Sequence, residues 1–562
     1  MNNYYKDASV VGTKSPYARR SIVKAVVTLS LLLPALLLFA ASARATTIYV
    51  SQNGGTFSGG SACNGQTAIS ASTFNSTTLS AGETVYLCGT ITSQLAPKNG
   101  GSSGNVVTLQ WDTGASVQVC NTTAAVNIGG LSYLTLDLGG NSTALECPNN
   151  GIGLSTQTEA IGIGDAGRGW SHIEIRHGTI GPIFVYSGTS NSGFGSVCIN
   201  GSYAPSYSHI HHLTFSGCAY GIQYQIAGNT DSDEFDHNTV GTSVGSFLWY
   251  ADGVDATYTA SNGSVHDNDF NYSSVWSVPG GYEHYEVMDI YNRGPDNGAH
   301  DAITNFQIYN NYFHGSSPNN SGSTAMLEMS WGLNNCGTTS TAEIKIFNNL
   351  IVDAGGGEGW SSESGGFFYD QGCDHTVSVY NNTMIGTNNS INSCFETLEG
   401  VGAANSVNTW TVKNNICTTM QFAFYNPQSV APTTFTENYN DFYNILASGF
   451  GGYMWKNADY YTLASWRSVT GQDANSITTN PNLSASYVPN TGSPVIGVGT
   501  NLTSLGITAL DTGAPQTFGV TGACGTGCLS RPSSGAWDLG AYQSGSAVAA
   551  PNPPTNLTAT PH

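Results

Sequence analysis

A short repeat in the middle of the chain constrains the fold more than any other feature. Nine segments each hold a brief alternation of apolar and polar residues, usually followed by Asn and a second apolar pair. Consecutive segments end 25 to 43 residues apart, with frequent glycine between them. Strand-like segments at this spacing are typical of a parallel solenoid with one coil per repeat. The aligned last positions are Gly178, Leu213, Asn238, Asn268, Asn311, Asn349, Asn382, Asn415 and Asn440.

Each repeat has the pattern of a strand that buries one face. In a strand of four or five residues, alternate side chains point inward, and each coil pairs with the coils above and below it. Asn tolerates the left-handed conformation at a bend, and stacked Asn amides can hydrogen-bond from coil to coil. The irregular spacing predicts loops of variable length that leave the tube, and such loops commonly hold functional residues.

The composition agrees with a solenoid and excludes several classes of protein. Gly accounts for 69 of 562 residues and only 9% of residues are charged, which excludes a coiled coil or a long amphipathic helix. The 40% of hydrophobic residues excludes a disordered chain. Six of the 15 basic residues lie before residue 46, so the rest of the chain has 9 basic and 35 acidic residues and a net charge of -26. This charge excludes electrostatic binding to nucleic acid and disfavours an anionic membrane surface.

The first 45 residues have the pattern of a signal peptide. Basic residues at positions 19, 20 and 24 precede an apolar run, and Ala43-Arg44-Ala45 is a small-x-small cleavage site. We expect cleavage after Ala45 and export of the mature chain. The alternative is an uncleaved anchor, because the run is nearly long enough to span a bilayer. No later stretch is apolar enough to span a membrane, and we expect a monomer.

All 12 cysteines follow residue 45, and an even number in an exported chain predicts disulfides. The sequence leaves their connectivity open. Cys63 with Cys88 and Cys120 with Cys147 are plausible local pairs. The Cys-Gly-Thr-Gly-Cys stretch at 524–528 is predicted to close a small disulfide loop, because no second metal-binding pair of the right spacing stands near it.

Several segments near the two ends resemble parts of known proteins. Residues 47–51 read Thr-Ile-Tyr-Val-Ser, residues 131–138 read Leu-Ser-Tyr-Leu-Thr-Leu-Asp-Leu, and residues 537–542 read Trp-Asp-Leu-Gly-Ala-Tyr. With the repeats between them, they resemble secreted proteins of the pectate-lyase-like superfamily over residues 46–545. The resemblance implies an all-β fold, a right-handed parallel β-helix, and leaves the activity open, because this superfamily hosts lyases, hydrolases and epimerases. Residues 546–562 resemble a linker and the truncated start of a fibronectin type III-like module.

The densest cluster of polar residues lies in the middle coils. Its acidic residues fall on successive repeats, and residues one repeat apart stack about 4.8 Å apart in a solenoid. Carboxylates of neighbouring coils are therefore predicted to converge on one face. The candidate catalytic residues are Asp252, Asp255, Asp289, Arg293, Asp301 and Glu328.

Two reactions fit these residues. Uronate elimination needs a base, for which Arg293 is available, and a cation that neutralises the substrate carboxylate. Ca²⁺ is the cofactor expected for that reaction, with Asp267 and Asp269 as candidate ligands. Glycoside hydrolysis needs two carboxyls that flank the bond, and Asp252-Gly-Val-Asp255 faintly resembles a catalytic stretch of polygalacturonases. Short Asp motifs are also common in turns, so structural duty is the alternative for these aspartates.

Aromatic residues flank the acidic cluster and suggest a sugar partner, because aromatic faces stack on flat ligands such as sugar rings. The candidate substrate-binding residues are Trp249, Tyr250, Tyr285, His300 and Trp331. We therefore expect an exported protein that acts on an extracellular polysaccharide by lyase or glycoside hydrolase chemistry. The negative charge slightly favours a neutral or weakly charged glycan. The alternative is a non-catalytic carbohydrate-binding or adhesion protein.

Three histidines, His209, His211 and His212, lie on one strand pattern. Histidine is a common metal ligand, but no carboxylate stands at metal-ligand spacing in this stretch of sequence. The sequence therefore favours a structural role for these three residues.

Overall fold

The computed structural model describes residues 47–119, 124–147, 158–164, 170–183, 196–201, 205–226, 229–252, 259–271, 287–291, 302–315, 325–329, 341–353, 366–370, 375–386, 393–397, 408–449, 451–511, 518–519 and 529–544. The predicted signal peptide, residues 1–45, and the predicted tail, residues 546–562, lie outside the described residues.

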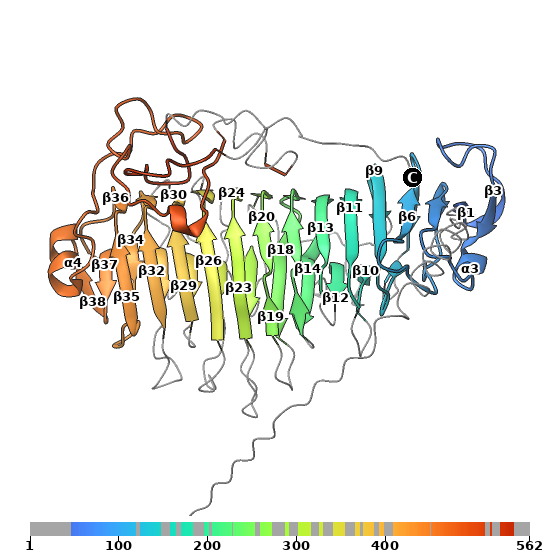
Figure 1. The fold of residues 1–562 in the computed structure, drawn as a ribbon, viewed down its shortest axis with the longest axis horizontal. Helices are drawn as coiled ribbons and strands as arrows, with labels where there is room; N and C mark the ends of the chain where they lie inside the picture. Colours follow the sequence, from blue (N-terminus) through green and yellow to red (C-terminus); the bar gives the residue numbers. More distant parts are fainter. Residues whose placement is uncertain are drawn as a thin grey trace, which may run out of the picture. The chain divides into compact units, whose positions relative to one another are not determined.

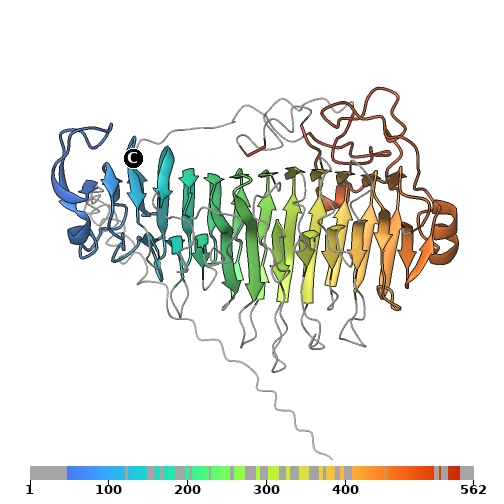
Figure 2. The same cartoon turned by 180° about the vertical axis from the view of Figure 1, so that it is seen from behind.

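The described chain is a right-handed parallel β-helix, as the repeat predicts. Its strands gather into two sheets, and in each sheet a strand pairs with the equivalent strand of the next coil. Figures 1 and 2 show the strands following one another in sequence order from β1 (Thr47–Ser51) to β38 (Ala458–Tyr460). None of the helices in the described ranges is both long and apolar enough to cross a membrane.

The smaller sheet has twelve strands and takes one strand from most coils. We call it the twelve-stranded sheet. Its last pair, β37 with β38, is antiparallel. In order along the sheet its strands are β8 (Val126–Asn127), β10 (Thr158–Gly162), β12 (Ser196–Gly201), β14 (Cys218–Ile226), β18 (Val244–Asp252), β22 (Met288–Tyr291), β25 (Ala325–Met329), β28 (Gly366–Asp370), β31 (Ser393–Thr397), β34 (Phe422–Tyr425), β37 (Gly452–Trp455) and β38.

The larger sheet has 26 strands, because most coils contribute one strand before a tight turn and one after it. Near the N-terminus it also includes β2 (Asn53–Thr56) and β3 (Thr67–Ser70), and two short strands, β15 (Thr230–Asp231) and β19 (Thr259–Ser261), extend it. The strands that precede the turn, some of which continue past it, are β4 (Thr84–Leu87), β6 (Val107–Trp111), β9 (Leu134–Glu146), β11 (Ile173–Ile180), β13 (His209–Phe215), β16 (Glu234–Asp236), β20 (Ser264–His266), β23 (Ala302–Tyr309), β26 (Thr341–Phe347), β29 (His375–Tyr380), β32 (Thr409–Lys413) and β35 (Thr434–Asn438). The strands that follow the turn are β5 (Thr90–Ile91), β7 (Ser116–Gln118), β17 (Thr239–Val240), β21 (Asp269–Asn271), β24 (Tyr312–Gly315), β27 (Leu350–Asp353), β30 (Thr383–Ile385), β33 (Ile416–Thr418) and β36 (Asp441–Tyr443).

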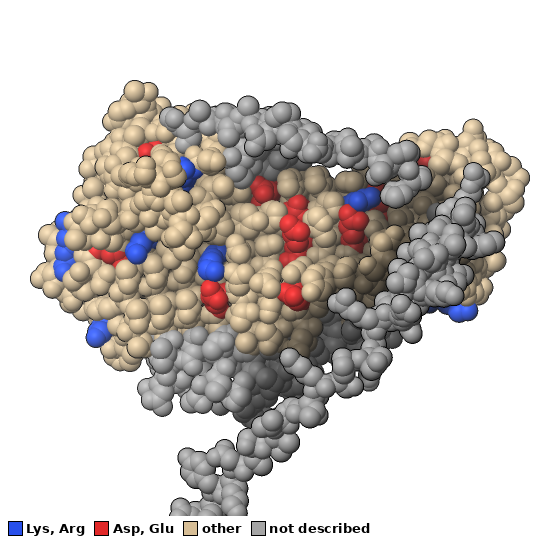
Figure 3. All heavy atoms as spheres, viewed as in Figure 1, with Lys and Arg blue, Asp and Glu red and all other residues tan. Residues whose placement is uncertain are grey.

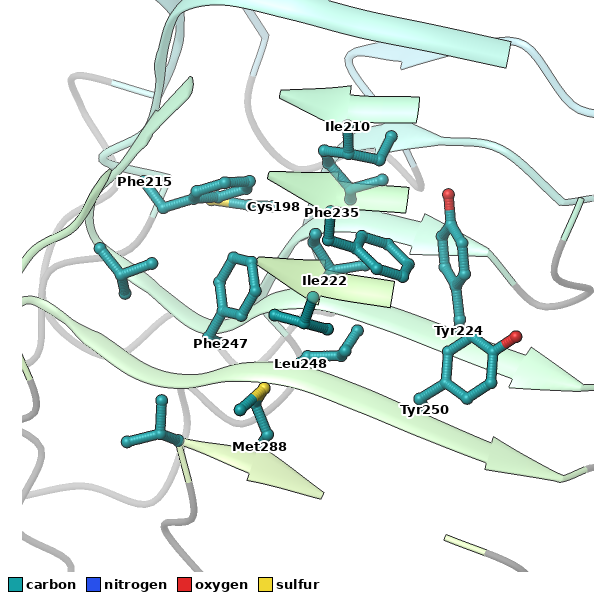
Figure 4. Close-up of a cluster of buried hydrophobic side chains, with 14 of the residues drawn as sticks. Cys198, Ile210, Phe215, Ile222, Tyr224, Phe235, Phe247, Leu248, Tyr250 and Met288 are labelled. Atoms are coloured by element: carbon teal, nitrogen blue, oxygen red, sulfur yellow. The ribbon is translucent and has the colours of Figure 1, made fainter. Parts of the chain in front are cut away.

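Apolar side chains of the repeat fill the inside of the coils. Burying one Val, Leu, Ile or Phe side chain stabilises a fold by about 1.5–3 kcal/mol. Figure 4 shows the packing between the sheets, where the ring of Phe235 lies 5.5 Å from that of Tyr224 in β14. One fully buried column in direct register consists of Ile175, Ile210, Phe235, Val265, Ile308, Ile346, Val379 and Val412.

A ladder of buried asparagines runs along the turn and confirms the stacking that the repeat predicts. From the second member on, the Oδ1 atom of each asparagine accepts the backbone N–H of the asparagine one coil earlier, at 2.9–3.1 Å. The side-chain amide donates to the same oxygen at 3.0–3.1 Å, again from the second member on. In the first member, Oδ1 of Asn238 accepts the backbone N–H of Leu213 at 3.1 Å. The members of this asparagine ladder are Asn238, Asn268, Asn311, Asn349, Asn382, Asn415 and Asn440, all with no exposed surface.

In the seven coils of the ladder, the left-handed residue of the turn is the one before the ladder asparagine, not the asparagine itself. In the two coils before them, it precedes Gly178 and Leu213. Its φ angle lies between 52° and 62° in nine coils. The ladder asparagine is fixed by its buried amide, so the preceding residue makes the bend and directs its side chain outward. We call these residues the turn column; they are His177, His212, His237, Asp267, Asn310, Asn348, Asn381, Asn414 and Tyr439.

In three disulfides both cysteines belong to the described residues. The predicted pair Cys63–Cys88 is confirmed, and the other two are Cys198–Cys218 and Cys394–Cys417. Cys147 is also disulfide-bonded. Its predicted partner and the predicted loop at 524–528 lie outside the described residues.

The C-terminal residues pack back onto the turn column of the later coils. The amide of Asn381 donates to the carbonyls of Asp538 and Gly540, and the amide of Asn414 donates to the carbonyl of Thr500. Buried Arg531 donates to Oδ1 of Asn348 at 3.1 Å. Figure 1 shows this segment above β30 and β36.

The helices among the described residues are short. They are α3 (Ala71–Phe74), α4 (Leu463–Thr470) and the 3-10 helix η1 (Thr503–Leu505).

Candidate functional site

One row on the twelve-stranded sheet holds three carboxylates. Parallel pairing sets Trp249 of β18 beside Asp289 of β22, and Asp289 beside Glu328 of β25. The row continues through Tyr369 of β28 to Glu396 of β31. We call these five positions the carboxylate row. The residues that precede them, which are buried in the core, are Leu248, Met288, Leu327, Phe368 and Phe395.

Strand alternation directs the three carboxylates of the row away from the core. They are nevertheless shielded from solvent: Glu328 is 2% exposed and Glu396 is 0% exposed, while Asp289 is half-buried. Neighbouring positions in a parallel sheet are about 4.8 Å apart, and positions two strands apart about 10 Å. Carboxyl pairs about 5 Å apart support retaining glycoside hydrolysis, and pairs about 6.5–9.5 Å apart support inverting hydrolysis.

Sequence reasoning missed Glu396. The signal was present, because Phe395-Glu396 lies one coil after Phe368-Tyr369 and likewise has a polar residue directly after a buried Phe. Aligning the twelve-stranded sheet coil by coil would have set Glu396 in the same row as Asp289 and Glu328.

The other predicted site residues of the middle coils fall in different places. Asp252 is the last residue of β18 and pairs with Ile226 of β14. The predicted roles of the remaining candidates stay predictions, because these residues lie outside the described residues. They are Asp255, Tyr285, Arg293, His300, Asp301 and Trp331.

Tyr250 lies inside the coil, which corrects the expectation that it stacks on a sugar. It is 1% exposed, and its hydroxyl donates to Oδ2 of Asp233 at 3.1 Å. Figure 4 shows its ring beside that of Tyr224. Successive residues of a strand face opposite sides, so Trp249 and Tyr250 cannot both face outward. Burial raises the pKa of Asp233 to about 6, against the hydrogen bonds from Ser208 and Thr230 that lower it.

The two predicted Ca²⁺ ligands flank a ladder asparagine. Asp267 accepts a hydrogen bond from Nδ1 of His266 at 2.8 Å, and Asp269 lies 2.6 Å from Nε2 of His314. Each carboxylate therefore has a histidine partner with which a Ca²⁺ ion would have to compete.

A second polar site covers the outer face of the larger sheet. Four successive coils each present three positions in register, and we call this set the histidine cluster. Figure 3 shows acidic side chains gathered over this region, around β11 to β20. Coil by coil, its members are Glu174, Arg176 and His177; His209, His211 and His212; Glu234, Asp236 and His237; and Ser264, His266 and Asp267.

The turn column explains why so many polar side chains meet here. Neighbouring residues of a regular strand would face opposite sides of the sheet. The left-handed conformation of His212, with a φ angle of 53°, turns its ring to the same side as that of His211. The two Nδ1 atoms lie 2.7 Å apart. The same bend brings His237 against Asp236 in the next coil.

Neighbouring groups of the histidine cluster shift one another's pKa values. The hydrogen bond from His211 is the main cause that lowers the pKa of Glu174 to about 2. Burial and the neighbouring rings of His237 and His211 lower the pKa of His212 to about 4. Burial would lower the pKa of His266, but its bonds to Asp267 and Glu234 raise it to about 9.

The sequence interpretation of His209, His211 and His212 is corrected by these contacts. Carboxylates do lie at metal-ligand distance, but they come from the neighbouring coils. His211 contacts Glu174, and His209 contacts Asp236. Groups of three whose potential ligand atoms all lie within 4.8 Å of one another include His177, His211 and His212.

Comparisons with known proteins give a likeness among solved structures. No family model matches the chain, and no curated protein matches it. Among solved structures, the chain is similar to the crystal structure of pectate lyase Pel9A, with 11% sequence identity and a TM-score of 0.34. The match covers 88% of this chain and 96% of that chain.

Proposed function

We propose that the protein is exported and hydrolyses an extracellular polysaccharide at the carboxylate row. The observation that carries this proposal is the direct register of Asp289 and Glu328 on neighbouring strands. Neighbouring strands lie about 4.8 Å apart. Glycoside hydrolysis requires two carboxyls on either side of the bond, one that protonates the leaving oxygen and one that attacks or activates water, and retaining enzymes hold them about 5 Å apart.

The two carboxyls differ in burial, and this difference suggests their roles. Glu328 is 2% exposed, whereas Asp289 is half-buried. Burial disfavours the ionised form of a carboxyl, so the more buried Glu328 is suited to act as the acid. The more accessible Asp289 is suited to act as the nucleophile or base. Trp249 occupies the register position next to Asp289 and stays a proposed sugar contact.

The alternative chemistry is uronate elimination with Ca²⁺, for which Arg293 is the proposed base. Among the described positions of the carboxylate row there is no Lys or Arg that could take that role. This favours hydrolysis as the reaction to test first, because hydrolysis needs no basic residue.

The test is product formation on a panel of polysaccharides, with Ca²⁺ or with a chelator. We expect new reducing ends without the ultraviolet absorbance of unsaturated uronates. Glu328→Gln should lower the rate at least about 100-fold, the usual contribution of a general acid. Glu343→Gln makes the same chemical change at an exposed site on β26 and should leave the rate unchanged.

Two results would overturn the proposal. Absorbance that depends on Ca²⁺ would identify a lyase instead. Binding to a glycan without any product would identify a non-catalytic carbohydrate-binding protein.

A further inference from the structure

Three imidazoles of the histidine cluster converge from two neighbouring coils. His177 is the turn-column residue within β11, and His211 and His212 lie one coil later, in β13. One nitrogen of each ring lies within 4.8 Å of a nitrogen of the other two. The Nδ1 atoms of His211 and His212 are 2.7 Å apart, so a proton must lie between them when no metal does.

Two of the three rings have a carboxylate on the far side. Nε2 of His211 lies 3.1 Å from Oε1 of Glu174, which leaves its Nδ1 directed at His212. Nδ1 of His177 lies 3.4 Å from Oδ1 of Asp137, which leaves its Nε2 for another partner. A carboxylate that accepts the far N–H of an imidazole is the usual support of a metal-binding histidine, because it fixes the ring and raises its basicity.

These supporting carboxylates are themselves held in position. Arg176 donates to Asp137 at 2.9 Å and to Glu174 at 2.7 Å, and Thr135 donates to Glu174 at 2.9 Å. Asp137, Glu174 and Arg176 together have one net negative charge, which favours a cation nearby. His177 and His212 are exposed, so one side of the triad faces solvent and can admit water.

We propose that His177, His211 and His212 bind one divalent transition metal of the Zn²⁺ class, with water as a further ligand. Imidazole nitrogens suit Zn²⁺, Cu²⁺ and Ni²⁺, whereas Ca²⁺ takes oxygen ligands. Zn–N bonds of about 2.0–2.1 Å in a tetrahedral site set ligand nitrogens about 3.3 Å apart. The 2.7 Å contact between His211 and His212 has to widen by about 0.6 Å, which small rotations of the exposed His212 ring provide.

A neighbouring group, His212 with Asp236 and His237, fits a metal less well. Both oxygens of Asp236 already accept histidine hydrogen bonds, one from His209 at 2.6 Å and one from His237. A metal there would have to displace both of these bonds, whereas the three-histidine triad loses only the proton between two rings.

Metal binding to the mature chain tests the inference directly. Zn²⁺ titration by calorimetry should show one site per chain, and Co²⁺ should give the visible absorption of a four-coordinate nitrogen site. The double variant His177→Asn and His212→Asn should weaken Zn²⁺ binding at least 100-fold. Asn is chosen because it occupies the same left-handed turn position at Asn310 and Asn348, so the coil should keep its path.

Two further variants separate the triad from its surroundings. Glu174→Gln removes the support of His211 and should weaken Zn²⁺ binding about 10–100-fold. His314→Asn changes a histidine outside the cluster, paired with Asp269, and should bind Zn²⁺ like the parent chain. Circular dichroism of each variant verifies the fold.

Three outcomes would overturn the inference. The parent chain could fail to bind Zn²⁺ and Co²⁺, or the double variant could bind Zn²⁺ as tightly as the parent. Finally, loss of binding in His209→Asn but not in the double variant would assign the metal to a neighbouring group of the cluster. All three are independent of whether the carboxylate row hydrolyses a glycan.

Discussion

The side-chain amide of Asn349 and its backbone N–H both donate to Oδ1 of Asn382, each at 3.0 Å. Oδ1 of Asn349 accepts the equivalent pair from Asn311. Asn349→Ala therefore strips two buried donors of Asn311 of their acceptor. We expect the free energy of unfolding to fall by about 3–5 kcal/mol, because each buried unsatisfied group costs about 1–3 kcal/mol. Urea unfolding measures this loss. The exposed control Asn475→Ala should cost less than about 0.5 kcal/mol, and equal losses would contradict a stabilising ladder.

Buried Asp441 in β36 should make the fold less stable as pH rises from about 4 to about 8. Burial raises its pKa from 3.8 to about 8. Between those values the folded chain keeps a proton that the unfolded chain releases, so the free energy of unfolding falls as pH rises. The Asn side chain of Asp441→Asn does not ionise. Between pH 4 and pH 8, the free energy of unfolding of this variant should therefore fall by about 3–5 kcal/mol less than that of the parent chain. Urea unfolding near pH 4 and near pH 8 is the measurement. Asp231→Asn should not reduce this fall, because hydrogen bonds from Asn262 and Ser232 lower the pKa of the half-buried Asp231. A parent chain equally stable at both pH values would refute the expectation.

The spacing of the carboxylate row predicts the stereochemistry of the proposed hydrolysis. Asp289 and Glu328 are adjacent in register, so their strands lie about 4.8 Å apart. Carboxyl groups that keep about this spacing have the separation of retaining enzymes. Nuclear magnetic resonance of the first products should therefore show the anomeric configuration of the substrate. Inversion would point to Glu328 with Glu396, about 10 Å apart across Tyr369, and Glu396→Gln would then abolish activity.

Arg531 should hold the C-terminal residues to the later coils. Its buried guanidinium donates to Oδ1 of Asn348 and to the carbonyls of Gly540 and Ala541. Arg531→Met leaves these acceptors unpaired and should cost about 2–4 kcal/mol of local stability. Limited proteolysis should then cleave within residues 495–543 at least 10-fold faster, while the coils stay resistant. Lys98→Met, at an exposed position, is the control, and unchanged cleavage in Arg531→Met would rule out this anchoring role.

Much of the fold could be predicted from the repeat, because period and polarity reflect local constraints. The ladder from Asn238 to Asn440 follows the aligned positions of the sequence. The conformation of the turn could not be predicted, since Asn suits both the left-handed position and the buried ladder. Only the hydrogen bonds between coils decide that the residue before each ladder asparagine makes the bend.

The sites were less predictable because they depend on neighbours one coil away. Convergence of carboxylates from neighbouring coils was predicted, with Asp289 or Asp301 beside Glu328, and Asp289 and Glu328 are in direct register. The carboxylates beside His209 and His211 were missed, since Glu174 and Asp236 belong to other coils. Tyr250 was misjudged because the strand boundaries, which decide the side that each residue faces, were unknown.

The asparagine ladder has a direction. In each bond between two ladder asparagines, the donor belongs to the earlier coil and the acceptor to the later one. The last amide, on Asn440, meets Oδ1 of Asp473 at 3.4 Å, and Oγ of Ser476 accepts the backbone N–H of Asn440. The ladder therefore ends on the carboxyl side chain of Asp473, at its C-terminal end only. New coils that lengthen this molecule should therefore be inserted before Asp473. A coil added after Asp473 would adjoin its carboxyl group, which lacks the amide N–H that the ladder asparagines from Asn268 on donate to the next coil.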